Sequence, residues 1–317
     1  MARAKQVYVE EILYTAAGQV EQITYGNGVV TDYTYDANLR LQNILTQDSA
    51  QTVIQNLSYA YYDNGNVETI TDSLTSEVKQ FGYDELDRLK SAQGNYGPGQ
   101  TFQTLSYGYD AHGNMTTKAG VTSYYNDANH VHAVTSYGAD TLSYDNNGNM
   151  LTHNGGGISR SFVYDIENRL KQYTQNSVVT TYKYDEEGSR IRKTSGGITT
   201  DYVGELYEED TTGTIRHHIF VNGDRVATVT DGTATFIHQD HLGSTSVKTN
   251  AAGLLADKAD YRPYGEFNTH QQSSDEEGYY FTDQHHDTES ELYYYNARYY
   301  NPELGRFLTA DWIIQDP

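Results

Sequence analysis

Paired histidines are the residues of this 317-residue sequence whose types and spacing most suggest metal chemistry. The pairs are His217 with His218, His238 with His241, and His285 with His286. Together with Asp240 or Asp287 they could supply imidazole and carboxylate ligands. Strand neighbours at odd spacing point to opposite faces, so His238 and His241 could share an ion only across a bend. Because the helical His-Glu-x-x-His arrangement is missing as well, the sequence favours hydrogen-bonded turn histidines and predicts neither a metal site nor a cofactor.

Three further groups of residues could do chemistry, but two lack a necessary partner and the third has a better structural explanation. Gly243-Ser-Thr has no Gly-x-Ser-x-Gly elbow for a serine nucleophile. Residues 152–157 contain His153 and three glycines that could cradle a phosphate, yet the Lys and the strand-to-helix context are missing, which favours a flexible turn. Tyrosine-rich faces could stack on carbohydrate, although ladders of cross-strand tyrosine pairs explain them better.

The elements that must position these residues come from an internal repeat, best seen at residues 105–115. Tyr107 and Tyr109 would lie on one face of a strand, and Asp110 would open a turn by accepting backbone N–H groups. Gly113 would supply a positive φ before Met115 resumes an apolar face. The pattern Tyr-x-Tyr-Asp-x-x-Gly-Asn-apolar therefore predicts one β-hairpin corner.

The pattern occurs in nine copies, and each copy can be anchored on its second tyrosine. The anchors are Tyr14, Tyr35, Tyr61, Tyr83, Tyr109, Tyr125, Tyr144, Tyr164 and Tyr184. Four residues after the anchor, every copy but one has a residue that tolerates a left-handed backbone; the exception is Leu39. Six residues after the anchor, every copy but one is apolar; the exception is Arg190. A period of about 20 residues fits two strands and two turns, and such hairpins must stack to bury their apolar faces.

The residues that the repeat assigns to its turns are Asp36, Asp84, Asp110, Gly113, Asp145, Gly148, Asp165, Asp185 and Gly188. Copies such as Tyr109-Asp-Ala-His-Gly-Asn and Tyr144-Asp-Asn-Asn-Gly-Asn resemble the tyrosine–aspartate (YD) repeats of Rhs proteins. That family includes toxin-complex C subunits, wall-associated YD proteins and teneurins. The resemblance covers nearly the whole sequence.

The C-terminal third resembles the Rhs-associated core. The matching stretches are Asp240-His-Leu-Gly-Ser-Thr245, Tyr261-Arg-Pro-Tyr-Gly-Glu266 and the aromatic run from Leu292 to Asp311. Within them the core motif falls on Asp240, His241, Gly243, Arg298, Gly305 and Arg306. This second block is more specific than the YD repeat alone.

One catalytic expectation comes from the same resemblance. Many Rhs cores and toxin C subunits cut themselves with an aspartyl-type site just after the core block, and Asp311 resembles its first acidic position. Two carboxylates that share a proton are what such peptide hydrolysis needs. The second element, Asp-Pro-x-Gly, is not found before the sequence ends at Asp316-Pro317. We therefore expect Asp311 to be a structural carboxylate here, with autoproteolysis at most in a longer polypeptide.

Composition narrows the function classes. A formal net charge of −22 argues against nucleic acid as a partner, because phosphate contacts need clustered Lys and Arg. The 31 tyrosines, 28 glycines and four prolines suit many strands and turns, and the charge keeps such an array soluble. No cysteine is present for a disulfide, and no run of about 18 apolar residues could span a membrane. No signal peptide follows Met1, so the protein is either cytoplasmic when made or a piece of a longer exported polypeptide.

Local patterns predict several elements along the sequence. Residues 1–13 suggest an edge strand or the cut end of an earlier repeat. Residues 14–200 suggest the repeat array, with its most variable loops at 43–56 and 91–103, and residues 253–258 a weak helix. Strands are expected at 215–221, 225–229 and 235–238, with a hairpin turn at 222–224. Residues 268–290 suggest an exposed loop, and 291–314 a packed aromatic plug or an interface.

These observations predict an all-β fold of consecutive antiparallel hairpins that forms one long spiralling sheet. Residues 1–200 would be the YD array and 201–317 the Rhs-core region continuous with it. The resemblance implies a hollow shell around a C-terminal toxin or effector, in a secreted or surface protein of bacteria, with other shell subunits as further partners. The alternatives are an extracellular adhesion or carbohydrate-binding module and a self-cleaving protease.

Overall fold

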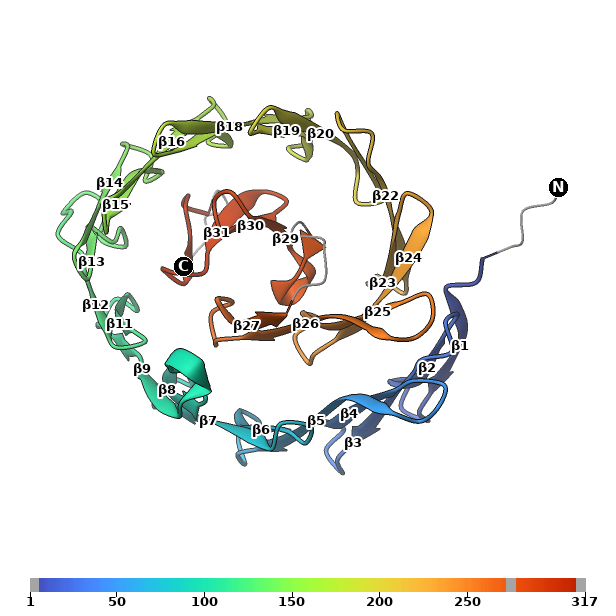
Figure 1. Cartoon of the computed structure of the whole chain (residues 1–317). Helices are drawn as coiled ribbons and strands as arrows, with labels where there is room; N and C mark the ends of the chain where they lie inside the picture. The colour runs from blue at the N-terminus through green and yellow to red at the C-terminus, as the bar shows by residue number, and fades with distance from the viewer. Residues whose placement is uncertain (1–5, 272–277, 312–317) are drawn as a thin grey trace. The chain divides into compact units, whose positions relative to one another are not determined.

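The computed structural model describes residues 6–271 and 278–311, and nearly all of its regular structure is β-strand (Figure 1). These described residues contain two single-turn 3-10 helices, η1 (Pro98–Gln100) and η2 (Phe281–Asp283), and no α-helix. None of their helical segments has the length and apolar character needed to cross a membrane. The predicted all-β fold of consecutive antiparallel hairpins is confirmed.

The chain divides into two compact units, of which the first comprises Met1–Leu105, Arg216–Pro263 and Phe267–Asp283. Its first nine strands pair in sequence order as one sheet: β1 (Val9–Tyr14), β2 (Val20–Tyr25), β3 (Val30–Tyr35), β4 (Leu41–Gln47), β5 (Val53–Tyr61), β6 (Val67–Asp72), β7 (Glu77–Tyr83), β8 (Leu89–Gly94) and β9 (Gln103–Ser106). Six more pair in order: β22 (Ile215–Val221), β23 (Asp224–Thr230), β24 (Thr233–Gln239), β25 (Thr245–Asn250), β26 (Leu255–Tyr261) and β27 (Phe267–Gln271). The short strand β28 is Gly278–Tyr279.

The second unit comprises Ser106–Ile215, Tyr264–Glu266 and Gln284–Pro317. Twelve strands pair in sequence order: β10 (Gly108–Tyr109), β11 (Met115–Lys118), β12 (Val121–Tyr124), β13 (Ser136–Tyr137), β14 (Asp140–Tyr144), β15 (Met150–Gly155), β16 (Ile158–Tyr164), β17 (Leu170–Gln175), β18 (Val178–Tyr184), β19 (Arg190–Ser195), β20 (Ile198–Val203) and β21 (Tyr207–Asp210). Four strands form its C-terminal segment: β29 (His285–Asp287), β30 (Leu292–Tyr295), β31 (Arg298–Asn301) and β32 (Arg306–Phe307).

Four local expectations were wrong, each because strand pairing extends further than the polar composition suggested. Residues 253–258 belong to a turn and to β26, not to a helix. Most of the expected loop at 43–56 is β4 and β5, and His153 lies on β15, with only Gly156 and Gly157 in the turn. In the expected loop at 268–290, β27 covers the start and buried β29 the end, while residues 272–277 lie outside the described residues.

Most repeat turns close around one aspartate carboxylate; in the first copy the Thr15 hydroxyl takes its place, and in the copy after Tyr61 the position is Tyr62. In the copy at Asp110, the N–H of Gly113 donates to the C=O of Asp110 (3.1 Å), and the N–H of Asp110 donates to the C=O of Asn114 (3.0 Å). Asp110 Oδ1 accepts the backbone N–H groups of His112 (2.8 Å) and Asn114 (2.9 Å). The strand register slips by one residue at Tyr109, so the corner is a tight turn followed by a β-bulge.

The same donors, two and four residues after the carboxylate, bind Oδ1 at 2.8–3.0 Å in the turns of Asp36, Asp84, Asp145, Asp165 and Asp185. In the turns of Asp36, Asp84, Asp110, Asp145 and Asp165, the second oxygen accepts a side chain four residues on, which is the Nε of Arg40, Arg88 or Arg169, or the amide of Asn114 or Asn149. One carboxylate thus satisfies the donors that a tight turn leaves without a strand partner.

In six of the nine copies the anchor tyrosine joins its hairpin to the preceding one. The tyrosine hydroxyl donates to a backbone carbonyl of the preceding copy, namely that of the residue six places after the anchor of that copy. This carbonyl lies at the β-bulge, where the hydrogen-bond ladder between the strands is interrupted. Six copies do so at 2.6–3.0 Å: Tyr35 to Val20, Tyr61 to Leu41, Tyr83 to Val67, Tyr125 to Met115, Tyr164 to Met150 and Tyr184 to Leu170. A phenylalanine would bury the same ring but leave that carbonyl without this donor, which explains the tyrosine bias.

Four residues after the anchor, the backbone is left-handed in nearly every copy, whatever the residue type. Eight of the nine positions have a positive φ, including Leu39 at +63°, which sequence chemistry marked as the exception. Leu39 is 58% exposed, so its side chain meets little crowding. Asn129 is the conformational exception, because Asp127 rather than Asn126 caps that turn and accepts the N–H of Asn129 at 2.8 Å.

Each unit has its own apolar core. In the second unit, Met150, Leu170 and Tyr182 of the repeat strands pack with Leu292 and Tyr299 of the C-terminal segment. In the first, β2 and β23–β24 contribute most of the apolar side chains, and the core consists of Ile23, Tyr25, Val29, Val226, Ala227, Val229, Ala234 and Phe236. The predicted packing of the aromatic C-terminal segment holds for the described residues, and Trp312 lies outside them.

The turn geometry predicts a clean difference between two neighbouring substitutions. Gly113 has φ +83°, and a Cβ there would meet nothing within 4 Å, so Gly113→Val adds backbone strain without a clash. We expect it to lower the free energy of unfolding by roughly 1–3 kcal/mol. Ala111→Val, in the same exposed turn, is the control and should change little. Thermal melts that show both variants to be equally stable would contradict the left-handed turn.

Candidate functional site

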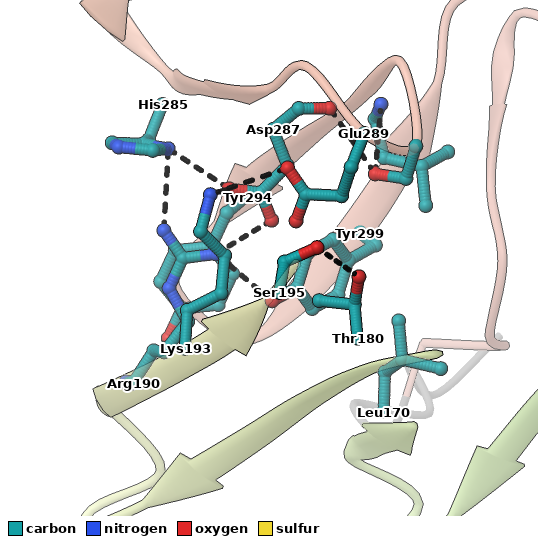
Figure 2. A network of polar contacts seen from close by, with 12 residues as sticks. Leu170, Thr180, Arg190, Lys193, Ser195, His285, Asp287, Glu289, Tyr294 and Tyr299 are labelled. Carbon is teal, nitrogen blue, oxygen red and sulfur yellow. Dashed lines mark hydrogen bonds and ion pairs between the residues drawn. The ribbon is translucent and has the colours of Figure 1, made fainter. Parts of the chain in front are cut away.

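A buried charge network occupies the second unit, where β19 meets β29 (Figure 2). The network consists of Arg190, Lys193, His285, Asp287 and Glu289. The carboxylate of Asp287 accepts Arg190 Nη1 at 2.7 Å and Lys193 Nζ at 3.2 Å, and it lies 3.1 Å from His285 Nδ1. Lys193 Nζ also donates to Glu289 Oε2 at 3.3 Å. These contacts tie the C-terminal segment to the repeat strands of the same unit.

Aromatic rings complete the surroundings of Arg190. Its guanidinium carbon lies 4.5 Å from the ring centroids of both Tyr202 and Tyr294. Arg190 Nη1 donates to the Tyr299 hydroxyl at 3.1 Å, and the backbone N–H of Arg190 donates to the Tyr294 hydroxyl at 2.7 Å. Cation–π contacts of this kind gain strength when water is excluded. Arg190, the polar exception in the repeat, is therefore the residue that the C-terminal segment recognises.

The network suits a structural clamp better than proton-transfer chemistry. Burial alone would raise the pKa of Asp287, but the Arg190 and Lys193 cations and the His285 hydrogen bond hold it well below its ordinary value. A carboxylate that stays ionised has no proton to donate, and one neutralised by two cations is a poor base. Asp287 has no exposed surface, so a substrate in solution cannot reach it.

The core-motif residues of the second unit make mainly structural contacts. Arg298 Nη2 lies 3.0 Å from Asp311 Oδ2, and its guanidinium carbon is 4.0 Å from the Phe307 ring centroid. Arg306 Nη2 donates to the backbone carbonyl of His132 at 2.6 Å. Gly305 has φ +67°, and a Cβ there would come within 3.2 Å of the Lys118 side chain. The Asp311 side chain is 53% exposed, with a guanidinium as its ion-pair partner.

The core-motif residues of the first unit form one more capped turn. Asp240 Oδ1 accepts the N–H groups of Leu242 (2.8 Å) and Ser244 (2.9 Å), and Gly243 has φ +76°. The ring of His241 lies 4.8 Å from that of Tyr59, and burial lowers the pKa of His241. The block Asp240-His-Leu-Gly-Ser is thus the repeat turn with its tyrosine replaced by Gln239.

Four of the paired histidines, His218, His238, His285 and His286, contact separate partners. His238 Nε2 lies 2.9 Å from Thr249 Oγ1, and burial lowers its pKa to about 3, so the ring stays neutral. His218 Nδ1 lies 3.0 Å from Thr228 Oγ1. His285 belongs to the buried charge network, whereas His286 Nε2 lies 3.3 Å from Glu291 Oε2.

Sequence reasoning missed three capped turns that lack a tyrosine. In each, Oδ1 accepts the N–H groups two and four residues on, at 2.8–3.2 Å; the capping residues are Asp48, Asp210 and Asn250. A left-handed residue follows three places later, namely Gln51, Gly213 or Gly253. A simpler sequence pattern would have found these turns. It is an Asp or Asn, then the left-handed residue three places later, then an apolar residue five places after the Asp or Asn.

Comparisons with known proteins agree with this geometry. The sequence profile of the teneurin YD-shell family matches residues 97–316. The toxin subunit YenC1 of Yersinia entomophaga is 26% identical over 97% of this chain, and the tRNA3(Ser)-specific nuclease WapA of Bacillus spizizenii is 30% identical over 65% of it. The structure of the Photorhabdus luminescens Tc holotoxin pore has a TM-score of 0.83 over 98% of this chain at 21% identity. A TcdB2–TccC3 crystal structure gives 0.81 over 98% at 21% identity.

These findings define a protein of stacked YD hairpins. The chain belongs to the teneurin YD-shell family. It spans 40% of the length of YenC1, 10% of WapA, and 18% and 19% of the polypeptides in the two solved structures. The likeness to those structures shows the fold, and the activities of the longer proteins belong to them.

The first prediction from this site concerns the pH dependence of the Asp287 contribution. Because Asp287 and its cations are buried, Asp287→Asn should cost roughly 3–5 kcal/mol of unfolding free energy at pH 7. The folded-state pKa lies below the unfolded value of 3.8, so this contribution is full above pH 3.8 and is lost as the pH falls through the folded pKa. Urea unfolding of both proteins at pH 7 and pH 3 should show the difference shrinking.

A matched control lies two residues from Arg190 on the same strand. Arg192 Nη2 donates to Asp201 Oδ2 at 2.8 Å, but both side chains of this ion pair are at least 43% exposed. Asp201→Asn should cost at most about 1 kcal/mol, because water screens exposed pairs. A difference between Asp287→Asn and the unsubstituted protein that stayed constant from pH 7 to pH 3 would show that packing, not charge, explains the loss.

The second prediction concerns Asp311. An aspartyl mechanism needs a carboxyl that shares its proton with another carboxyl, whereas Asp311 Oδ2 lies 3.0 Å from the Arg298 guanidinium. A polypeptide of these 317 residues should therefore keep its full mass of 35.7 kDa in long incubations at pH 5 and pH 7, as measured by intact-mass spectrometry. Scission of this polypeptide would place a catalytic pair within it. In a polypeptide extended by its natural downstream sequence, scission that survives Asp311→Asn would remove Asp311 from the mechanism.

Proposed function

We propose that this chain is a structural segment of the shell of a larger bacterial Rhs-type toxin protein, in which it encloses and presents a C-terminal toxic polypeptide. The observation that carries the proposal is that this YD-shell protein uses its motif residues for structural contacts. The turn aspartates cap backbone N–H groups, and the anchor tyrosines bond the preceding hairpin. Residues consumed in this way are not free to bind a substrate.

The named relatives support the toxin context. YenC1 is a toxin subunit, and WapA is a nuclease of which this chain matches 10% of the length. The similarity covers part of each, as expected for a scaffold joined to different effectors. The partners proposed for this chain are therefore a C-terminal toxin or effector domain and other shell subunits. Its location would be secreted or at the cell surface, as part of the larger protein.

The division into a YD array at 1–200 and an Rhs-core region at 201–317 is part of the same proposal. The capped turn continues past residue 200, at Asp210, Asp240 and Asn250, so the two regions share one building principle. What distinguishes the second region is its aromatic C-terminal segment, which packs against repeat strands within the second unit. We infer that this segment is the element that ends the scaffold before the effector begins.

Limited proteolysis of the full-length gene product tests enclosure. The polypeptide downstream of residue 317 should survive a protease when attached to this chain and be degraded when expressed alone. Asp287→Asn, which weakens the buried charge network, should shorten that survival, whereas Asp201→Asn should leave it unchanged. Circular dichroism of each variant would show that the strands are intact.

Equal cleavage of the attached and the isolated polypeptide would contradict enclosure. If the protein then retained one class of glycan on an array, the adhesion or carbohydrate-binding function would take its place. Tyrosines already bonded to a neighbouring carbonyl, such as Tyr61 and Tyr184, are poorly placed for sugar stacking, and we expect no such retention.

A further inference from the structure

Three side chains of the second unit, outside the buried charge network, bring metal-binding atoms together. Asp140 is the first residue of β14, His153 lies on the neighbouring β15, and Glu303 lies in the turn between β31 and β32. One ligand atom of each lies within 4.8 Å of the others. We propose that Asp140, His153 and Glu303 bind a divalent transition-metal ion of the zinc class. This site is independent of the proposed shell function.

The imidazole of His153 is held in place for such a role. His153 has no exposed surface, and its Nε2 lies 2.9 Å from Asp140 Oδ2. Its Nδ1 is buried and has no hydrogen-bond partner among residues 6–271 and 278–311. The equivalent residues of the next two repeats, Tyr173 and Lys193, bond Gln175 and Asp287 instead. The side chain at this inward position therefore has a different partner in each of the three repeats. Only in the repeat of His153 is it an imidazole beside a carboxylate.

Gly155 makes room for the second ligand. Thr141 pairs with Asn154 in the ladder, so Gly155 lies opposite Asp140. A Cβ on Gly155 would come within 1.5 Å of Asp140 Oδ1. Gly155 is not among the residues with positive φ, in contrast to the two glycines after it, so backbone conformation does not explain this glycine. The matching positions of the next two repeats are Gln175 and Ser195, so the repeat itself does not require glycine here.

The charge and chemistry of the three ligands fit a divalent ion. Zinc takes imidazole nitrogen and carboxylate oxygen, and three protein ligands leave a fourth position for water. Arg160 Nη2 lies 4.0 Å from Glu303 Oε2, at the limit of an ion pair. With Arg160 counted, two carboxylates and one guanidinium leave one net negative charge before the ion enters. The Glu303 side chain is 44% exposed, so an ion can enter from solvent and Glu303 can then close on it.

Bound metal would add a second link between the C-terminal segment and the repeat strands of this unit. Glu303 belongs to the C-terminal segment, whereas Asp140 and His153 belong to the repeat hairpins. A ligand that binds only the folded protein stabilises it in proportion to the logarithm of its concentration over its Kd. Zinc should therefore raise the melting temperature.

The experiment is a zinc titration of the untagged protein after dialysis against EDTA. Calorimetry should show one ion per molecule, and cobalt as a spectroscopic substitute should give the visible absorption of a low-coordinate site. Glu303→Gln and Asp140→Asn should each weaken zinc binding at least about tenfold. The zinc-induced rise in melting temperature should disappear with them.

The control is a second histidine–aspartate pair, which within residues 6–271 and 278–311 belongs to no group of three metal-binding side chains. His130 Nδ1 lies 2.9 Å from Asp127 Oδ2, and Asp127→Asn should leave zinc binding unchanged. Two outcomes would overturn the site: no stoichiometric zinc, or equal affinity in the Glu303→Gln and Asp127→Asn variants. Glu303 is a turn residue with a half-exposed side chain, so Glu303→Gln should fold, as circular dichroism without metal will show. Neither outcome bears on enclosure, which the protease experiment tests separately.

Discussion

The structure depends on one recurring hydrogen-bonded corner, in which a side-chain oxygen, in most turns that of an aspartate, accepts the backbone N–H groups of a tight turn. A hairpin that reverses within four residues and then bulges leaves N–H groups without ladder partners, and leaving them unsatisfied would be costly. Asp110 Oδ1 accepts two such groups and Oδ2 takes up the side chain of Asn114, so one residue fixes the corner. Because a hairpin alone cannot bury its apolar face, this corner is useful only when hairpins are stacked.

The anchor tyrosine links successive hairpins to one another. The ring of Tyr164 packs against the apolar core of the second unit, and its hydroxyl bonds the carbonyl of Met150 at the preceding bulge. The turn and the inter-hairpin bond are therefore encoded in adjacent residues, Tyr164 and Asp165. That local encoding explains why the fold class and the hairpin order could be predicted from the sequence. It also explains why turns without tyrosine, such as Asp48, escaped the same pattern.

What the sequence could not predict depends on contacts between distant residues. The position of Arg190 in the repeat indicated an irregularity, but its partner Asp287 lies 97 residues away and came from a stretch expected to be an exposed loop. His153 was assigned to a flexible turn because three glycines follow it, whereas strand pairing buries it completely. The polar composition of these segments misled the interpretation, since polar side chains in this protein often face inward and find partners there.

At positions where the side chain departs from the repeat, this protein makes contacts that the other repeats do not make. At the inward positions of β15, β17 and β19 the regular scaffold is the same, yet the side chains are His153, Tyr173 and Lys193. Two of these departures are matched by residues from elsewhere: Lys193 by Asp287, and His153 by Asp140, with Glu303 nearby. Because the turns satisfy much of the backbone, single inward side chains of the repeat can differ without changing the hairpins. Selection can then place individual clamps and sites along the array without altering the fold.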